Sequence, residues 1–186
     1  IDPKVKVPVH DLIKGRIVQS GNDATMALAE GVGGTAESFV QLMNEQALAL
    51  GMRATADRNP TGLTVAGHIT TARDLSILAT RLMQDFPEYV HYYAIKKYHY
   101  EGTPAANDGN RNLLLLRDPS VDGLKTGHTA AAGFCLIATA KRDFPNLGAP
   151  GATPGTPGAI GGRRLLVIVL GTARENARAT GWQKTH

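Results

Sequence analysis

The chain has 186 residues, of which 42% are hydrophobic and 19% charged, and it carries a net charge of +4. This length and composition are typical of one globular domain with a sizeable core, and they exclude a disordered chain. No apolar run approaches the roughly 18 to 20 residues of a membrane-spanning helix, and residues 1–9 lack the pattern of a signal peptide.

Three further classes of site are disfavoured by residue type and spacing. The basic residues are scattered rather than clustered, so we expect no nucleic-acid partner. The single cysteine, Cys135, excludes an internal disulfide. The six histidines show no ligand spacing on one helix face, and we therefore expect no metal site.

The first half of the chain is predicted to be helical. A helix is expected over residues 8–18, where Asp11 suits the positive end of the helix dipole. Residues 20–23 then form a turn, because turn-forming residue types stand together there. A second helix covers residues 24–29 and ends at the glycines that follow.

Two longer helices follow. Apolar residues at intervals of four, four and three predict a helix from Thr35, closed by Gly51, through Phe39, Met43, Ala47 and Leu50. A turn is expected at residues 59–62. At the next helix start, Thr71 is expected to accept a backbone proton while Asp74 reaches back. The buried face of that helix is predicted to comprise Leu75, Leu78, Leu82 and Met83.

The second half of the chain is predicted to form a sheet. Aromatic and β-branched residues indicate extended structure over residues 89–100, and a loop follows over 102–110. Neighbouring antiparallel strands are expected at 121–126 and 132–140, joined near 127–131, and a third strand at 164–170.

The last part of the chain has a different composition. Residues 146–162 are nearly all Gly, Pro, Ala and Thr, which predicts an exposed flexible loop within the domain. Residues 174–182 could begin a closing helix. We therefore expect one α+β domain over 1–186, mainly helical over 1–88, with a sheet and closing helix over 89–186 and a cleft where the two layers meet.

Two short motifs carry the chemistry. Serine enzymes that attack peptide or β-lactam amides use a Ser-x-x-Lys, a Ser-x-Asn and a Lys-Thr-Gly. The second motif is present as Ser20-Gly21-Asn22 and the third as Lys125-Thr126-Gly127. The first is absent, because Ser20, Ser38, Ser76 and Ser120 are followed three positions later by Asp23, Gln41, Ala79 and Gly123.

In such an enzyme each residue of the Lys-Thr-Gly segment would have a role. The backbone N–H of His128 would donate to the oxyanion of the tetrahedral intermediate. Lys125 would bring positive charge to a substrate carboxylate or to proton transfer, and Thr126 would offer that carboxylate a hydroxyl. Gly127 would let the substrate lie against the strand.

The Ser-x-Asn turn would supply the other side of the site. Ser20 could pass a proton to the leaving amine, and Asn22 could hold both the substrate amide and a catalytic lysine. Either motif alone is more often a plain turn. The two motifs together are far more specific for such an enzyme, because they occur in the expected order, one on a turn between helices and the other at the entry to a strand.

The residues around both motifs resemble the low-molecular-mass penicillin-binding proteins, the D-alanyl-D-alanine carboxypeptidases of bacterial cell-wall metabolism. The likeness covers nearly the whole chain. It rests on Asp11-Leu12-Ile13-Lys14-Gly15, Ser20-Gly21-Asn22-Asp23-Ala24, Thr71-Ala72-Arg73-Asp74-Leu75, Asn110-Arg111-Asn112-Leu113-Leu114 and Val121-Asp122-Gly123-Leu124-Lys125-Thr126-Gly127-His128-Thr129.

This resemblance implies a β-lactamase/transpeptidase-like fold, incomplete at the N-terminus, and a serine acyl-enzyme that removes the terminal D-alanine of peptidoglycan stem peptides. It implies penicillins as inhibitors, no cofactor, and a place in the periplasm or cell-envelope exterior, associated with the inner membrane. By the same resemblance Arg111 and, more weakly, Arg174 would contact a substrate carboxylate. Arg111 is equally compatible with a structural ion pair.

The departures from the family pattern define the alternatives. The nucleophilic Ser-x-x-Lys is expected on a segment before residue 1, so the chain alone is expected to be inactive. A serine β-lactamase shares both motifs but needs a carboxylate for deacylation, and no Glu-x-x-Leu-Asn occurs here. A non-catalytic peptidoglycan-binding relative, or a fragment with a structural role only, is the other alternative.

Overall fold

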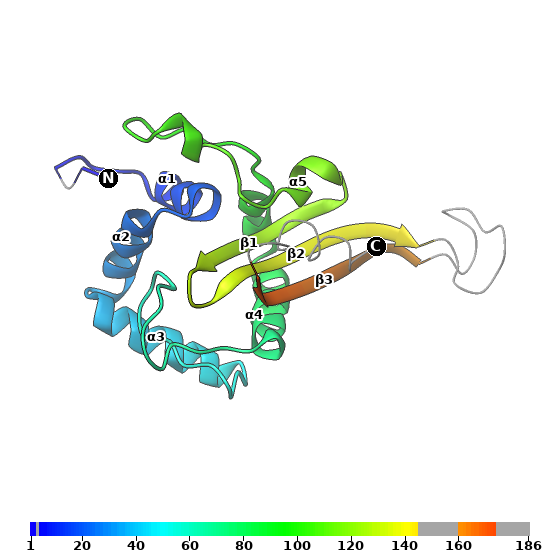
Figure 1. Cartoon of the computed structure of the whole chain (residues 1–186), viewed down its shortest axis with the longest axis horizontal. Coiled ribbons are helices and arrows are strands. Elements are labelled where there is room, and N and C mark those ends of the chain that lie inside the picture. The colour runs from blue at the N-terminus through cyan, green and yellow to red at the C-terminus, as the bar shows by residue number, and fades with distance from the viewer. Residues whose placement is uncertain (3, 145–159, 174–186) are drawn as a thin grey trace.

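A helical layer and a β-sheet make up the computed structural model, which describes residues 1–2, 4–144 and 160–173 (Figure 1). The elements in chain order are α1 (Val9–Lys14), the π-helix η1 (Gly15–Gln19), α2 (Asn22–Gly33), α3 (Ala36–Ala49), α4 (Ala72–Asp85), the 3₁₀-helices η2 (Pro87–Ala94) and η3 (Ala105–Asn107), α5 (Leu114–Arg117), β1 (Val121–Thr129), β2 (Gly133–Phe144) and β3 (Ile160–Thr172). Within the described ranges every helix is too short or too polar to cross a lipid bilayer.

The first three predicted helices are confirmed. The one expected over residues 8–18 is continuous but changes from α to π geometry at Gly15. Thr35 caps α3 by accepting a hydrogen bond from the Ser38 N–H at 3.1 Å. Gly51 follows α3 with a φ of 80°, a left-handed conformation that glycine adopts without steric penalty.

Of the two contacts predicted for the start of α4, the structure has one. Thr71 accepts a hydrogen bond from the Asp74 N–H at 3.1 Å, as expected of a cap. The Asp74 carboxylate does not reach back to it; it accepts hydrogen bonds from the Ala54 N–H at 2.8 Å and the Thr55 hydroxyl at 2.7 Å. Asp74 is 4% exposed, so the preceding chain provides the partners that a buried carboxylate needs.

The buried face of α4 is centred on Ala79, which is 3% exposed. The prediction that Leu78 belongs to this face is wrong, because Leu78 is 42% exposed. Successive residues of an α-helix are rotated by about 100°. Leu78 therefore lies at the margin of a stripe centred on Ala79, whereas Leu75 and Met83 lie about 40° from its centre and are half-buried.

The prediction of extended structure over residues 89–100 is wrong for its first half, which forms η2. Pro87 occupies the first turn, where its missing N–H leaves no helical hydrogen bond unmade. A 3₁₀-helix places side chains three apart on one face, and the rings of Tyr89 and Tyr92 stack there with centroids 6.5 Å apart. Local stacking thus outweighs the β-propensity of these aromatic residues. Farther on, Lys97 pairs with Gly109 in a single β-bridge.

The sheet has the antiparallel order β1-β2-β3, as predicted, and among the described strands β1 lies at an edge. β1 is longer than expected: Gly127 pairs with Cys135, His128 with Phe134 and Thr129 with Gly133. Residues 127–129 of the connection expected over 127–131 therefore lie in β1, and the turn itself covers residues 130–132. This gives Lys125 and His128 the rigidity of a paired backbone on one side.

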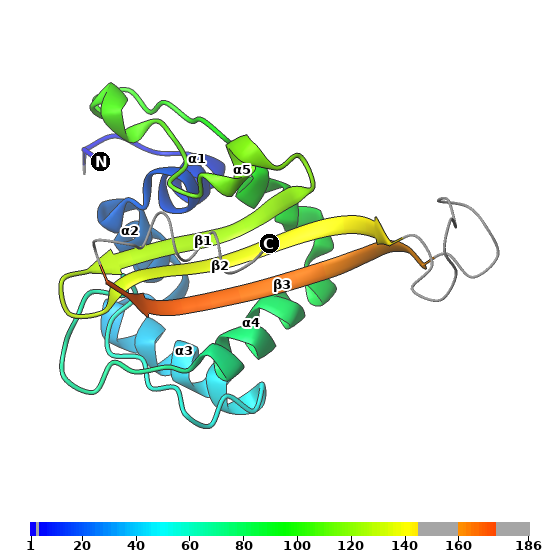
Figure 2. The same cartoon turned by 45° about the vertical axis from the view of Figure 1, so that its right-hand side comes forward.

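Helices pack against the sheet through α4, which contacts β3, and η2, which contacts β1. Figure 2 shows α4 crossing behind the three strands. A Cβ atom at Gly123 would lie 3.0 Å from Oγ1 of Thr139 and 3.3 Å from Cβ of Tyr93, so η2 and β2 pack tightly around the start of β1. The buried apolar core comprises Leu12, Ile17, Val18, Ala24, Ala29, Ala47, Met52, Ala79, Leu115, Leu124, Ala138 and Ala140.

Two predictions fall mainly outside the described residues. The flexible loop expected over residues 146–162 lies outside them except for its last three residues, which begin β3. The closing helix expected over 174–182 also lies outside them.

Candidate active site

Ser20 sits at the end of η1 in a left-handed conformation, with φ 57° and ψ 36°. Such a conformation is unfavourable for a residue with a side chain. The neighbouring backbone holds it there, because the Gly21 N–H donates to the carbonyl oxygen of Gly15 at 3.0 Å. The Gln19 side chain donates to the Tyr98 carbonyl at 3.3 Å and to the Thr103 hydroxyl at 3.2 Å.

Lys125 brings the two motifs together. Its Nζ atom donates a short hydrogen bond to Oγ of Ser20 and a second one of 2.9 Å to the carbonyl oxygen of Thr126. Ser20 and Lys125 are 105 positions apart in the sequence. The hydrogen bond between them shows that the helical half and the edge of the sheet meet at these side chains.

The pKa of Lys125 is lowered from 10.5 to about 7. Burial is the main cause, because it penalises the charged ammonium form, and the positive charges of Arg16 and Arg111 lower the pKa further. Near neutral pH a substantial fraction of Lys125 is therefore the neutral amine. A neutral amine can accept the proton of Ser20, whereas the ammonium form can only donate to it.

Arg16 is a site residue that the sequence interpretation missed. It lies in η1, one helical turn before Ser20, and its charge acts on both Lys125 and Tyr93. Burial lowers the pKa of Arg16 and raises that of Tyr93, and the charge of Arg16 opposes the rise at Tyr93. The spacing from Ser20 was the available signal, since residues four apart share one helix face.

Four other predicted residues lie beside this pair. Asn22 is the first residue of α2 and is exposed, and among the described residues its side chain has no hydrogen-bond partner. Thr126 is half-buried, whereas Gly127 and His128 are exposed on β1. The His128 ring packs on that of Phe134 with centroids 4.1 Å apart, which fixes the plane of the imidazole.

The two predicted arginines are placed differently. Arg111 is exposed and close enough for its charge to lower the pKa of Lys125, but within the described ranges it forms no hydrogen bond or ion pair. Arg174 lies outside the described residues. Beside Arg111, the fully buried Asn112 donates to the Gly123 carbonyl at 3.0 Å and accepts from the Leu114 N–H at 3.2 Å. Asn112 thereby braces the strand two residues before Lys125.

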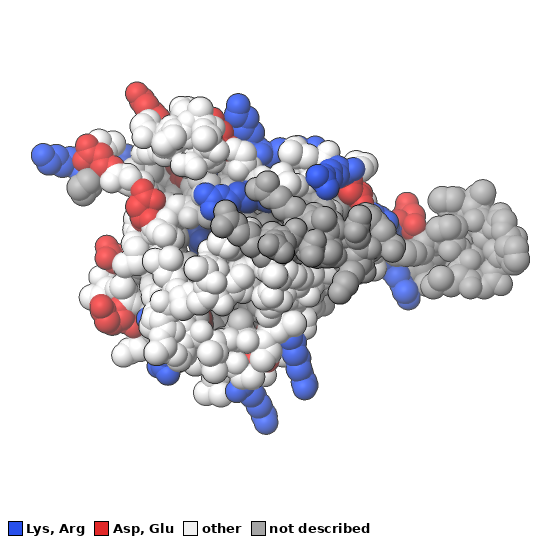
Figure 3. Space-filling model, viewed as in Figure 1, with Lys and Arg blue, Asp and Glu red and all other residues white. Residues whose placement is uncertain are grey.

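The charges of the wider molecule do not single out another site. On the face drawn in Figure 3, Lys and Arg are spread over several places and do not form one patch. No group of three or more His, Cys, Asp or Glu side chains that could hold a metal ion occurs in the part of the chain that the structure describes. The site consists of hydroxyl, amine, amide and guanidinium groups, which suits acid–base and oxyanion chemistry.

Family membership follows from comparison with known sequences. A sequence model described as D-alanyl-D-alanine carboxypeptidase, peptidase S11, matches residues 1–149. The chain belongs to this family. It is 39% identical over 179 residues to the D-alanyl-D-alanine carboxypeptidase DacC of Escherichia coli, covering 96% of this chain, and 39% identical over 150 residues to DacF of Bacillus subtilis, covering 76%.

Solved structures of penicillin-binding proteins share the fold of this S11 chain. Penicillin-binding protein 5 of Haemophilus influenzae superposes with a TM-score of 0.82 and 34% identity over 99% of this chain. Penicillin-binding protein D2 of Listeria monocytogenes, in its cefotaxime-bound form, superposes with a TM-score of 0.75 and 30% identity over 98% of this chain. The predicted family and α+β transpeptidase-like fold are therefore confirmed.

The S11 chain is shorter than these relatives. Its match spans 40% of the E. coli protein and 37% of the B. subtilis protein. It covers 48% of the H. influenzae chain and 66% of the L. monocytogenes chain.

Proposed function

We propose that this chain is most of the catalytic domain of a serine D-alanyl-D-alanine carboxypeptidase, which removes the terminal D-alanine from peptidoglycan stem peptides. The observation that carries the proposal is the hydrogen bond from Lys125 to Ser20, which joins the Ser-x-Asn and Lys-Thr-Gly motifs at one place. Membership of the S11 family supports the same activity.

The nucleophile would come from a Ser-x-x-Lys on a segment before residue 1. Its Oγ would attack the carbonyl carbon of the penultimate D-alanine and form an acyl-enzyme ester. The C–N bond would break and D-alanine would leave as the amine, taking one proton. Water would then hydrolyse the ester and return the proton to the serine.

Ser20 and Lys125 would supply the proton to the leaving amine. The Ser20 hydroxyl can donate to the departing nitrogen while it recovers a proton from the Lys125 ammonium group. A lysine with a pKa of about 7 is suited to this exchange, because both protonation states are populated near neutral pH. Asn22, exposed at the start of α2, would hold the substrate amide and the lysine of the Ser-x-x-Lys.

The edge of β1 would hold the substrate backbone. Among the described residues, a Cβ atom at Gly127 would meet only Cβ of Cys135, at 3.9 Å, so their packing does not require a glycine there. Its absence of a side chain instead leaves room for a ligand against the strand. The His128 N–H would donate to the oxyanion, and the Thr126 hydroxyl, with Arg111 and Arg174, would bind the terminal carboxylate.

The same proposal places the protein at the bacterial cell-envelope exterior, associated with the inner membrane, because its substrate is the stem peptide of peptidoglycan. β-Lactams would be its inhibitors. They would acylate the same serine, and slow hydrolysis of that ester would trap the enzyme.

Covalent labelling with a fluorescent penicillin tests the proposal. The 186-residue chain alone is expected to form no adduct, whereas the longer protein, with its Ser-x-x-Lys, is expected to form one at that serine. Ser20→Ala in the longer protein should slow acylation by roughly 10²- to 10⁴-fold, the usual contribution of a general acid or base. Arg53→Ala, at an exposed position outside the proposed site, serves as the control.

Three results would overturn the proposal. Labelling of the 186-residue chain alone would place the nucleophile within it. Rapid multiple turnover of nitrocefin by the longer protein would identify a β-lactamase. Binding of peptidoglycan without any adduct would identify a non-catalytic relative.

A further inference from the structure

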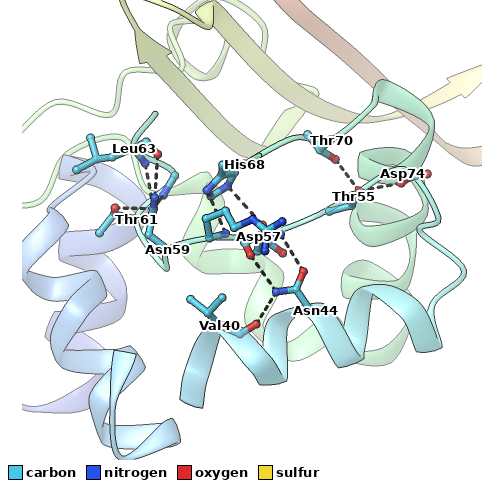
Figure 4. A network of polar contacts seen from close by, with 12 residues as sticks. Val40, Asn44, Thr55, Asp57, Asn59, Thr61, Leu63, His68, Thr70 and Asp74 are labelled. Carbon is cyan, nitrogen blue, oxygen red and sulfur yellow. Dashed lines mark hydrogen bonds and ion pairs between the residues drawn. The ribbon is translucent and has the colours of Figure 1, made fainter. Parts of the chain in front are cut away.

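Residues 59–67 form a loop between α3 and α4, here called the 59–67 loop, and the Asn59 side chain organises its first half. Oδ1 of Asn59 accepts hydrogen bonds from the Thr61 hydroxyl at 2.9 Å, the Gly62 N–H at 2.8 Å and the Leu63 N–H at 3.2 Å. Its Nδ2 donates to the Leu63 carbonyl at 2.8 Å. Figure 4 shows these contacts closing the turn on itself.

The base of the 59–67 loop is tied to α3. In Figure 4 the Asn44 side chain points from α3 to the backbone of Asp57. Asn44 accepts from the Asp57 N–H at 2.8 Å and donates to the Asp57 carbonyl at 3.0 Å. A β-bridge between Ala56 and Ile69 closes the two ends of the segment, and His68 lies 3.4 Å from the Asp57 carboxylate.

The tip of the loop reaches the sheet. Oγ1 of Thr64 lies 2.7 Å from Oγ1 of Thr129, the last residue of β1, and these residues are 65 positions apart. Thr129 Oγ1 also accepts a hydrogen bond from the Ala132 N–H at 3.0 Å in the turn that follows. A single exposed hydrogen bond between neutral groups contributes little to the stability of a fold. It does join the 59–67 loop to the end of the strand.

β1 is thus held from the helical half at two points along its edge. One is the hydrogen bond between Lys125 and Ser20, and the other is that between Thr129 and Thr64. Between them lie Thr126, Gly127 and His128, the residues assigned to substrate binding above. A strand at a sheet edge has hydrogen-bonded neighbours on one side only, so a second restraint limits its motion on the open side.

We propose that Thr64 is a positioning residue, which fixes the C-terminal end of β1 so that Gly127 and His128 meet the substrate in one geometry. Its role in the reaction rests on the proposed function, whereas the restraint on the strand does not. Thr64 has no direct part in the proposed nucleophilic attack or proton transfer. It affects the reaction by holding Thr129, and with it the end of β1, in place.

The restraint itself is tested in the 186-residue chain by amide hydrogen exchange. Thr64→Val keeps the shape of the side chain but removes the hydroxyl, and Thr64→Ser keeps the hydroxyl. We expect Thr64→Val to speed exchange about threefold or more over residues 127–133 and to leave α4 unchanged, while Thr64→Ser behaves as wild type. Thr80→Val, the same change at an exposed position of α4, is the control. Unchanged exchange over residues 127–133 would overturn the proposal.

The positioning role is tested in the longer protein by the rate constant of acylation with a fluorescent penicillin. Thr64→Val should slow acylation by about 3- to 30-fold, less than the roughly 100-fold that a 1 Å misplacement can cause. Thr64→Ser should restore the rate, and the Tm of both variants should stay within about 4 °C of wild type. Faster exchange with unchanged acylation would overturn the positioning role, provided that Ser20→Ala slows the reaction. If Ser20→Ala has no effect, the proposed function fails, and hydrogen exchange still decides whether Thr64 restrains the strand.

Discussion

Nζ of Lys125 donates a hydrogen bond to Oγ of Ser20, across 105 residues of sequence. The amine lies at the edge of the sheet and the hydroxyl at the end of a helix. The contact therefore joins the helical layer directly to the sheet. It also joins a titrating group to a hydroxyl. Any change in the protonation of Lys125 must alter what Ser20 can donate or accept.

Lys125 should therefore titrate near pH 7, where burial and two arginines place its pKa. Below that pH its ammonium group donates to Ser20; above it the neutral amine can accept the Ser20 proton. We expect the Cε chemical shift of Lys125, followed by NMR in the 186-residue chain and assigned with Lys125→Met, to change with a midpoint near pH 7. A midpoint close to 10.5 would show that the amine is solvated and separate from the arginines.

Replacing Arg16 by Met should raise the pKa of Lys125, because a nearby positive charge disfavours the ammonium form. Arg111→Met should raise it by less, since Arg111 contributes less to the lowering. The measurement is the same NMR titration. Arg73→Met, at an exposed position in the first turn of α4, changes the net charge equally and should leave the midpoint in place. An equal shift in all three variants would mean that net charge alone sets the pKa.

The left-handed backbone of Ser20 should be measurable as strain. Ser20→Ala and Ser20→Gly both remove the hydroxyl, but only glycine accepts a φ of 57° without a steric penalty. We expect the Gly variant to be more stable than the Ala variant by about 1 kcal/mol, from urea unfolding of the 186-residue chain. The two share the loss of the Lys125 contact, so the difference isolates the backbone. Equal stabilities would show that the conformation is not strained.

The sequence was sufficient to predict elements whose signals are local. The helix start at Thr35, the cap at Thr71, the glycine after α3 and the strands on either side of residues 130–132 depend on neighbouring residues, and the structure has them. The prediction of extended structure failed over the first half of residues 89–100. Their aromatic composition suits a strand, whereas ring stacking at a spacing of three favours a 3₁₀-helix.

The site was predictable only in part, for a different reason. Motif spacing singled out Ser20 and Lys125, because the proposed chemistry needs those residue types in that order, and the structure shows that the two side chains meet. The contributions of Asn112 and Thr64 depend on contacts between separate segments of the chain, and no local pattern encodes them. Arg16 has a local signal in its spacing from Ser20, but its effect on the pKa of Lys125 depends on the tertiary structure. Tertiary contacts of this kind affect the pKa of Lys125 and the position of β1. Sequence patterns therefore indicate which side chains form the candidate site, but not their pKa values or exact positions.

Gly127→Ala should separate substrate binding from folding. The added Cβ would be 3.9 Å from Cβ of Cys135, an ordinary contact, and the φ of Gly127 is not in the left-handed range. The free energy of unfolding should therefore stay within about 0.5 kcal/mol of wild type. A methyl group on the exposed edge would nevertheless hold a ligand away from the strand, and we expect acylation of the longer protein by a fluorescent penicillin to slow by at least about 10-fold. Gly31→Ala, at an exposed position of α2 where no atom of the described residues lies within 4 Å of the added Cβ, is the matched control and should acylate at the wild-type rate. Wild-type acylation by Gly127→Ala would mean that the substrate does not lie against β1 at this residue, and the binding edge would have to be placed elsewhere.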